Sequence, residues 1–336
     1  MTALQLPIRP RRNRKHPAIR AFARECWLGP EHFILPLFVH DSHGCVDIPS
    51  MPGQQRLDLD GLLRAGERAL QAGVSALALF PRVDDALKST GGEEAWNEGG
   101  LIPRAIASIK ARMPELVVIT DVALDPYSTW GHDGLVDSEG RVANDATVAA
   151  LCQQALCQAR AGVDIVAPSD MMDGRVGAIR AALDGDGWHD VSILAYTAKY
   201  ASAFYGPFRD ALDSAPRAGG KAPRDKKTYQ MDPANAREAL REVALDEREG
   251  ADLLMVKPAG PYLDVISKVR AATTLPVAAY QVSGEYAMLK AAASRGWLDE
   301  RSVVLESLLG IRRAGADVIL SYYAIEAARW LREEAQ

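Results

Sequence analysis

This 336-residue sequence has no apolar stretch of the roughly 20 residues that a membrane-spanning helix requires. Its first residues are charged, but no apolar core follows them, so we expect no secretory signal. Cysteine is scarce, and none of the four cysteines has metal-binding spacing. These absences predict a cytoplasmic protein with reduced thiols and no membrane contact. The four cysteines are Cys26, Cys45, Cys152 and Cys157.

The charge balance gives little sign of a nucleic-acid partner. The chain is 48% hydrophobic and 25% charged, with a formal net charge of -5, which is ordinary globular composition. A basic cluster at residues 9–15 stands alone in this acidic chain, without an aromatic and basic face behind it. We therefore expect no nucleic-acid binding, and we expect residues 1–30 to form an extended N-terminal arm that contacts other subunits.

Apolar runs of strand length recur along the chain, separated by longer helical patterns. They are continuous rather than alternating, as is typical of strands that are covered on both faces. The eight predicted strands are 33–39, 74–80, 116–122, 163–167, 191–196, 252–256, 276–281 and 317–322.

A glycine follows the helical pattern before four of these strands, at Gly73, Gly162, Gly250 and Gly315. Glycine just past a helix end adopts the left-handed conformation that stops the helix. The repeat predicts a helix-to-strand unit, and eight such strands predict a (β/α)8 TIM barrel over residues 31–336. The alternative, an open doubly wound sheet, needs a glycine-rich phosphate fingerprint after its first strand, and the sequence has none.

One connection in the predicted barrel is unusually long. Residues 203–231 include "APRAGGKAPRDKKTYQM", which is rich in glycine, proline and basic residues. Long loops in compact domains are usually lids or disordered segments. We interpret this loop as an active-site lid whose positive charge suits an anionic ligand.

Two lysines stand at the ends of neighbouring predicted strands, where the active site of such a barrel gathers. They are Lys199 and Lys257. One lysine there could simply extend its amine to water, but two buried amines lower each other's pKa by desolvation and repulsion. Lowering the pKa of a lysine from about 10.4 to near 7 corresponds to roughly 4–5 kcal/mol of differential interaction between its two protonation states. A partly neutral amine attacks ketones to form a Schiff base, so the pair predicts carbonyl chemistry.

Long blocks of the sequence resemble one enzyme family. They read "APSDMMDGR", "YTAKYASAFYGPFRDA", "KTYQMDPAN", "LLMVKPAGPYLD" and "YQVSGEYAM". They are similar to the porphobilinogen synthase family, also called δ-aminolevulinic acid dehydratase. The resemblance implies a barrel with an N-terminal arm, usually a homo-octamer. It also implies condensation of two molecules of 5-aminolevulinate to porphobilinogen, with loss of two waters, in tetrapyrrole (heme) synthesis.

The resemblance also implies roles for individual residues. Lys257 matches the lysine that binds the substrate forming the propionate side of the product, and Lys199 matches the lysine of the acetate-side substrate. The other matched positions contact the two substrates. Those on the acetate side are Arg209, Lys226, Tyr205, Phe208, Gln230, Asp125 and Asp133; those on the propionate side are Ser283, Tyr322 and Tyr280.

The stretch "DVALDPYSTWGHDG" bears on the metal. The zinc-dependent branch of the family has cysteines where this chain has Ala123, Asp125 and Asp133, so we expect no catalytic zinc. Asp125 and Asp133 are expected to bind the acetate-side amino group, with a monovalent cation or water. His132 lacks partner cysteines, and Trp130 stands where relatives often have histidine, which argues against a proton relay there.

A magnesium site remote from catalysis occurs in the branch without these cysteines. The resemblance places its carboxylate at Glu242, and a solvated helix face is an equal alternative for this residue. Two other functions stay open from the residues alone. One is a Schiff-base aldolase that uses a single lysine, and the other is a ligand-binding protein that has kept the barrel.

Overall fold

The computed structural model describes residues 6–216 and 222–335, and over these residues eight parallel strands close into a barrel. Each strand pairs with the next, and the last pairs with the first to close the sheet. The predicted (β/α)8 barrel is therefore confirmed. The strands are β1 (Phe33–His40), β4 (Ala76–Arg82), β5 (Val117–Val122), β6 (Ile165–Pro168), β7 (Ser192–Lys199), β8 (Leu253–Lys257), β9 (Val277–Gln281) and β10 (Val318–Ser321).

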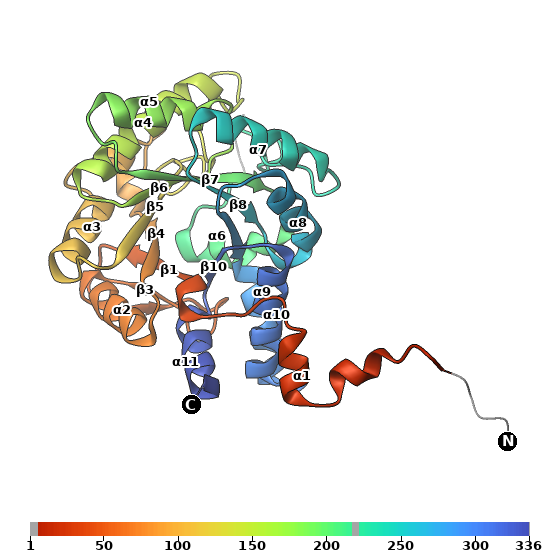
Figure 1. The fold of residues 1–336 in the computed structure, drawn as a ribbon. Coiled ribbons are helices and arrows are strands. Elements are labelled where there is room, and N and C mark those ends of the chain that lie inside the picture. The colour runs from red at the N-terminus through yellow and green to blue at the C-terminus, as the bar shows by residue number, and fades with distance from the viewer. Residues whose placement is uncertain (1–5, 217–221, 336) are drawn as a thin grey trace.

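Helices surround this barrel, as Figure 1 shows. They are α2 (Leu59–Ala72), α3 (Leu101–Arg112), α4 (Asn144–Arg160), α5 (Arg175–Gly185), α6 (Gly206–Leu212), α7 (Arg237–Glu249), α8 (Leu263–Ala272), α9 (Ser283–Ser294), α10 (Glu300–Ala314) and α11 (Ala324–Ala335). Two short strands, β2 (Val46–Asp47) and β3 (Gln55–Leu57), extend the sheet beside β1. No helix of the described residues is both long and apolar enough to span a bilayer.

The four predicted helix-to-strand glycines all have a positive φ, between 86° and 118°. A side chain would strain this backbone, which is why glycine stands there. An aspartate lies two residues after three of these glycines. Asp164, Asp252 and Asp317 each accept a hydrogen bond from a backbone amide in the first two residues of the preceding strand, at 2.7–2.9 Å. These contacts lie at the amino ends of the strands and leave the carboxyl ends free for chemistry.

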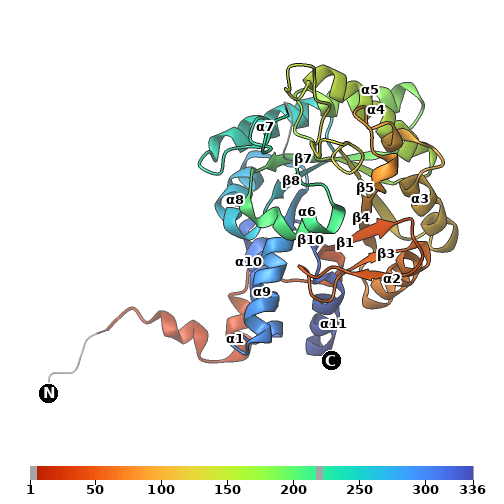
Figure 2. The ribbon, with the colours of Figure 1, turned by 180° about the vertical axis from the view of Figure 1, so that it is seen from behind.

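The arm and α6 occupy different places relative to the barrel. The arm carries the short helices η1 (Pro10–Arg14) and α1 (Pro17–Phe22), and none of their residues is buried. It extends away from the barrel in both Figure 1 and Figure 2. Helix α6 follows the end of β7 and lies across the barrel mouth in Figure 2. Residues 217–221 of the predicted lid lie outside the described residues.

Candidate active site

Lys199 and Lys257 are direct partners across two neighbouring strands. They end β7 and β8, and their Cα positions are paired in register. The register shifts between Ala195 and Ala198, where β7 contains one extra residue. A bulge of this kind reverses the side-chain alternation that follows it. The two amines therefore point to the same side of the sheet, as carbonyl chemistry at one site requires.

Lys257 lies in an aromatic enclosure. Its Nζ atom is 4.6 Å from the ring centre of Tyr280, 4.9 Å from that of Phe208 and 5.2 Å from those of Tyr196 and Tyr205. Among the described residues this nitrogen has no carboxylate partner within ion-pair distance. Burial, reinforced by the charge of Lys199, lowers the pKa of Lys257 to about 7. The lowered pKa favours the neutral, nucleophilic amine near neutral pH.

Lys199 has the opposite environment, because its amine is held by acceptors. Its Nζ donates to Oδ2 of Asp133 at 2.9 Å and to the backbone carbonyl of Ser169. Burial alone would raise the pKa of Asp133, but the ammonium groups of Lys199 and Lys226 hold it below its usual range. The site thus contains one amine that loses its proton near neutral pH and one that is ion-paired.

Lys226 joins both predicted aspartates. Its Nζ lies 2.5 Å from Oδ1 of Asp133 and 3.2 Å from Oδ2 of Asp125, and all three side chains are nearly fully buried. Burial would lower the pKa of Lys226, but the two carboxylates raise it, so this amine stays charged. Gln230 Nε2 completes the cluster, at 3.4 Å from Asp133 Oδ2.

Eight of the predicted residues line one pocket at the carboxyl ends of the strands. They are Lys199, Lys257, Asp125, Tyr205, Phe208, Arg209, Lys226 and Gln230. Asp133 is in contact with three of them, Lys199, Lys226 and Gln230. Arg209 and Lys226, from α6 and from the predicted lid, also share a more open pocket outside this one. The two cations therefore line both the enclosed and the open pocket.

The predicted propionate-side residues, Tyr280, Ser283 and Tyr322, are not among the residues that line this pocket. The hydroxyls of Tyr280 and Tyr322 are hydrogen-bonded to each other at 2.9 Å and are fully buried. Ser283, the first residue of α9, accepts a hydrogen bond at 2.9 Å from the backbone amide of Phe208. Ser283 thus links α9 to α6, the helix that carries Phe208 and Arg209.

Two residues at this site were not among the predicted site residues. Asp121, near the end of β5, lines the pocket, and its buried Oδ1 has no hydrogen-bond partner among the described residues. Burial, with help from Asp125, raises the pKa of Asp121 to about 7, against the opposing charges of Lys199 and Lys257. Ser169 follows β6 and contacts Lys199. The rule that strand ends form the site would have included both.

His132 is held by the predicted lid. Its Nε2 is 2.9 Å from the carbonyl of Pro223 and its Nδ1 is 3.0 Å from the hydroxyl of Tyr229. Because a carbonyl only accepts, Nε2 carries the proton and Nδ1 accepts from Tyr229. Burial lowers the pKa of His132, which favours this neutral ring. Trp130 is half-buried, and its backbone amide donates to Ser128 Oγ at 3.1 Å.

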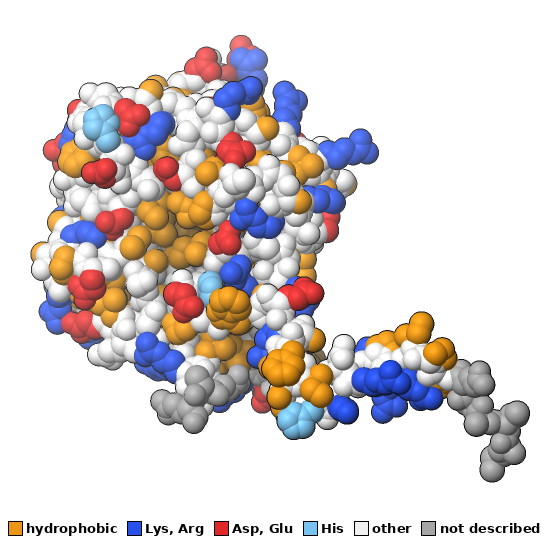
Figure 3. Space-filling model, viewed as in Figure 1, with side chains coloured by type: hydrophobic (Ala, Val, Ile, Leu, Met, Phe, Trp, Pro, Cys, Tyr) orange, Lys and Arg blue, Asp and Glu red, His pale blue; other side chains and the backbone are white. Residues whose placement is uncertain are grey.

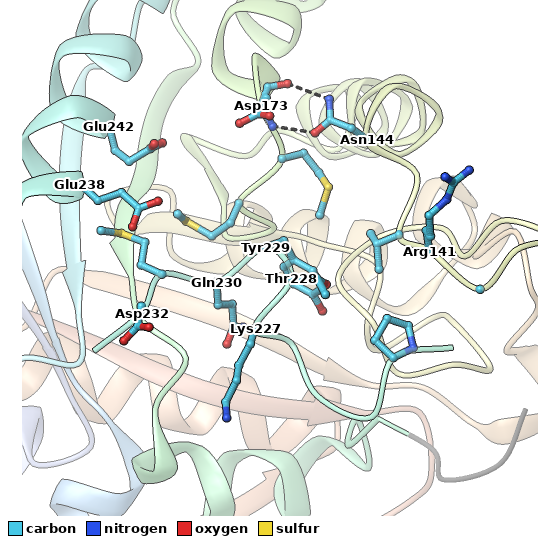
Figure 4. Close-up of a pocket in the computed structure, with 16 residues that line it drawn as sticks. Arg141, Asn144, Asp173, Lys227, Thr228, Tyr229, Gln230, Asp232, Glu238 and Glu242 are labelled. Carbon is cyan, nitrogen blue, oxygen red and sulfur yellow. Dashed lines mark hydrogen bonds between the residues drawn. The ribbon is translucent and has the colours of Figure 1, made fainter. Parts of the chain in front are cut away.

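Glu242 is not in the active-site pocket. It lies on α7 beside a separate hollow of about 660 Å³, which is also lined by Asp173 and Glu238. Figure 4 shows Glu238 and Glu242 pointing from α7 toward this hollow. Burial raises the pKa of Glu242 to about 7, and the charges of Asp173 and Glu238 add to the effect. Within the described part of the chain, no three candidate ligands are close enough to form a ready metal cage.

A barrel with two aligned lysines at its carboxyl end, one enclosed by aromatic rings and one paired with a carboxylate, defines an enzyme of carbonyl chemistry. The comparisons with known proteins specify which one. Residues 7–330 match the family model described as delta-aminolevulinic acid dehydratase. The chain belongs to this family, which confirms the predicted function of a porphobilinogen synthase in tetrapyrrole synthesis.

Individual members of the family are similar in sequence to this protein over nearly its whole length. The delta-aminolevulinic acid dehydratase of Physcomitrium patens is 61% identical over 99% of this chain and 76% of its own length, and that of Chlamydomonas reinhardtii is 55% identical over 99% and 87%. The solved enzyme of Toxoplasma gondii, in complex with the reaction product porphobilinogen, has a TM-score of 0.96 and 57% identity, covering 98% of this chain and 94% of that one.

The predicted cytoplasmic location is contradicted by these relatives. Those at 55–61% identity are named chloroplastic, which points to a plastid instead. Scarce cysteines fitted a cytoplasmic protein, but they fit any reducing compartment equally well.

Proposed function

We propose that the two lysines divide the synthesis of porphobilinogen between two molecules of 5-aminolevulinate, each bound as a Schiff base. The observation that carries this proposal is the contrast between Lys257, enclosed by aromatic rings, and Lys199, paired with Asp133. The neutral Lys257 amine attacks the ketone of the propionate-side substrate, and water leaves as the imine forms. Lys199 binds the acetate-side ketone.

Charged groups then orient the acetate-side substrate. Arg209 and Lys226 line the same entrance and bind its carboxylate. Asp125 and Asp133 bind its amino group, which takes over the positive charge that Lys226 supplies in the free enzyme. Tyr205, Phe208 and Gln230 form the walls of this half of the pocket. Ketone, amine and carboxylate are each held, so the C–C and C–N bonds form between positioned reactants.

The propionate-side carboxylate binds to Ser283 and Tyr322, with Tyr280 beside them. In the free enzyme these hydroxyls have backbone or mutual hydrogen bonds, which a carboxylate acceptor would replace. The segment 203–231 closes over both substrates and protects the imines from water. The contacts of His132 with Pro223 and Tyr229 support this role, because they fasten the described part of the segment to the site.

The metal requirement is part of the same proposal. No catalytic zinc is needed, because Ala123, Asp125 and Asp133 offer no thiolate. A monovalent cation or water accompanies the two aspartates once Lys226 turns to substrate. Magnesium would be held at Glu242 as an allosteric ion that needs only one or two carboxylates, and the supporting observation is that Glu242 and Glu238 line the same hollow.

The proposal includes assembly into a homo-oligomer, specifically an octamer, in which the N-terminal arm contacts other subunits. Figure 3 shows the arm standing off the barrel with blue and orange side chains on its surface. Its exposed apolar residues are Leu6, Ile8, Phe22 and Trp27. Apolar side chains gathered on an extended segment are typical of a surface that a partner covers.

Separate substitution of the two lysines tests the proposal. Lys257→Met and Lys199→Met should each abolish product formation, whereas an aldolase with one essential lysine would tolerate one of them. Borohydride reduction with 5-aminolevulinate should leave an adduct on Lys257 in the unaltered enzyme and in Lys199→Met. Arg295→Met, an exposed cation far from the site, is the control. The proposal is wrong if no adduct forms or if either lysine variant keeps full activity.

A further inference from the structure

A buried carboxylate joins the two loops that carry the proposed propionate-side groups. It belongs to Glu285 on α9, whose side chain is only 5% exposed. Its Oε1 accepts a hydrogen bond from the Gly260 amide at 2.7 Å. Its Oε2 accepts from the Ala259 amide at 3.3 Å and from the Val282 amide at 2.8 Å.

These three amides belong to the loops that follow two neighbouring strands, β8 and β9. Ala259 and Gly260 are the second and third residues after Lys257, in the loop that leaves β8. Val282 directly precedes Ser283, in the loop that leaves β9. The side chain of Glu285 therefore holds the loop that follows Lys257 against the loop that leads to Ser283.

The rest of the Lys257 backbone is fixed from the opposite side. Its carbonyl accepts hydrogen bonds from the Tyr200 amide at 3.0 Å and from the Tyr205 hydroxyl at 3.2 Å. These two residues follow β7, so Glu285 supplies the connection toward β9. The fit around the carboxylate is close, because a Cβ added at Gly260 would lie 2.6 Å from Oε1.

We infer that Glu285 is a positioning residue that sets the distance between Lys257 and Ser283, and thereby selects ketones with a carboxylate at the right spacing. The inference rests on the proposed function, since it takes Lys257 and Ser283 to hold the two ends of one substrate. A glutamate that only capped helix α9 would also accept a hydrogen bond from the Val282 amide. It would not explain the two further bonds to the Lys257 loop.

Two small ketones measure this selection directly. The first is 4-oxopentanoate, and the second is 2-pentanone, in which a methyl group replaces the carboxylate. Each is reduced onto Lys257 of the full-length enzyme with cyanoborohydride, and the half-saturating concentration is read from the adduct mass. The unaltered enzyme should strongly prefer 4-oxopentanoate, and Ser283→Ala should lose that preference.

Glu285→Gln should raise the half-saturating concentration of 4-oxopentanoate by about tenfold and leave that of 2-pentanone unchanged, since an amide retains only one acceptor oxygen for three amides. Gly260→Ala displaces the carboxylate from the other side and should act in the same direction, which covers the case that Glu285→Gln folds poorly. The control is Asp252→Asn. Asp252 accepts the Ile193 amide at 2.7 Å at the opposite end of the barrel, so its loss should lower thermal stability without changing the preference.

Equal weakening of both ketones in Glu285→Gln and Gly260→Ala, or an unchanged preference in both, would overturn the inference and leave the proposed function intact. An unaltered enzyme that forms no Lys257 adduct with either ketone would overturn the proposed function, and the inference with it.

Discussion

The carboxylate of Asp133 lies 2.9 Å from the ammonium group of Lys199, and the exposed fractions of the two side chains are 1% and 7%. The same carboxylate also contacts Lys226. One buried aspartate thus offsets two buried cations, whereas Lys257, on the adjoining strand, faces aromatic rings. This unequal distribution of negative charge gives the two lysines different electrostatic surroundings.

Asp133→Asn should destabilise the enzyme strongly. It leaves two buried ammonium groups without their shared partner, and breaking a buried pair in this way costs about 3–5 kcal/mol. Chemical unfolding measures the difference. Asp264→Asn is the matched control, because Asp264 pairs with Lys268 at 2.9 Å on an exposed helix face, where an ion pair contributes about 0.3–0.5 kcal/mol. Similar losses in the two variants would contradict the buried role of Asp133.

Imine trapping at Lys257 should depend on pH in a defined way. The neutral amine reacts, and the pKa of Lys257 is lowered to about 7 by burial and by Lys199. The trapping rate should therefore rise from pH 6 to pH 8 and then level off. An unperturbed lysine, with a pKa near 10.4, would give a rate that still rises at pH 9.

The variant Lys199→Met tests whether the charge of Lys199 lowers the pKa of Lys257. Removing the second positive charge should move the midpoint of the Lys257 profile to higher pH, because repulsion no longer favours the neutral amine. An unmoved midpoint would mean that burial alone sets this pKa.

His132→Ala should loosen the described part of the lid. The substitution removes the hydrogen bonds to Pro223 and Tyr229, which together contribute about 1–3 kcal/mol. Trypsin should then cleave after Lys226 or Lys227 several times faster, and kcat should fall. His189→Ala, at an exposed position, should change neither quantity. Unchanged cleavage would show that other contacts hold the segment.

Removal of magnesium should lower activity several-fold, and adding it back should restore the loss. Glu242→Gln should abolish both the response and the heat of magnesium binding in calorimetry, because a neutral amide is a poor ligand for a hard dication. The exposed Glu306→Gln on α10 is the control. Full activity after chelation would rule out the magnesium proposal.

Much of the fold follows from local patterns. Continuous apolar runs located all eight barrel strands to within a few residues, because strands covered on both faces need apolar side chains throughout. Glycines such as Gly250 marked where helices end. Lys199 and Lys257 were identifiable because parallel strands bring their carboxyl ends to one mouth.

The plastid location of the relatives and the role of Glu285 had no such pattern. The strand-end rule includes Asp121, but only the structure shows that its buried Oδ1 has no hydrogen-bond partner among the described residues. Glu285 is one acidic residue in the first turn of a helix until its partners from the Lys257 loop are known.

The sequence by itself determined the barrel, the strand ends and the kinds of side chain found there, because these depend on periodicity and on residues adjacent in the chain. Only the tertiary structure decided how the two lysines differ. The extra residue in β7 turns Lys199 to the side of Lys257, Asp133 reaches Lys199 from a loop 66 residues away, and rings from separate elements enclose Lys257. Register and burial arise from packing between distant segments, and they set the surroundings of each amine.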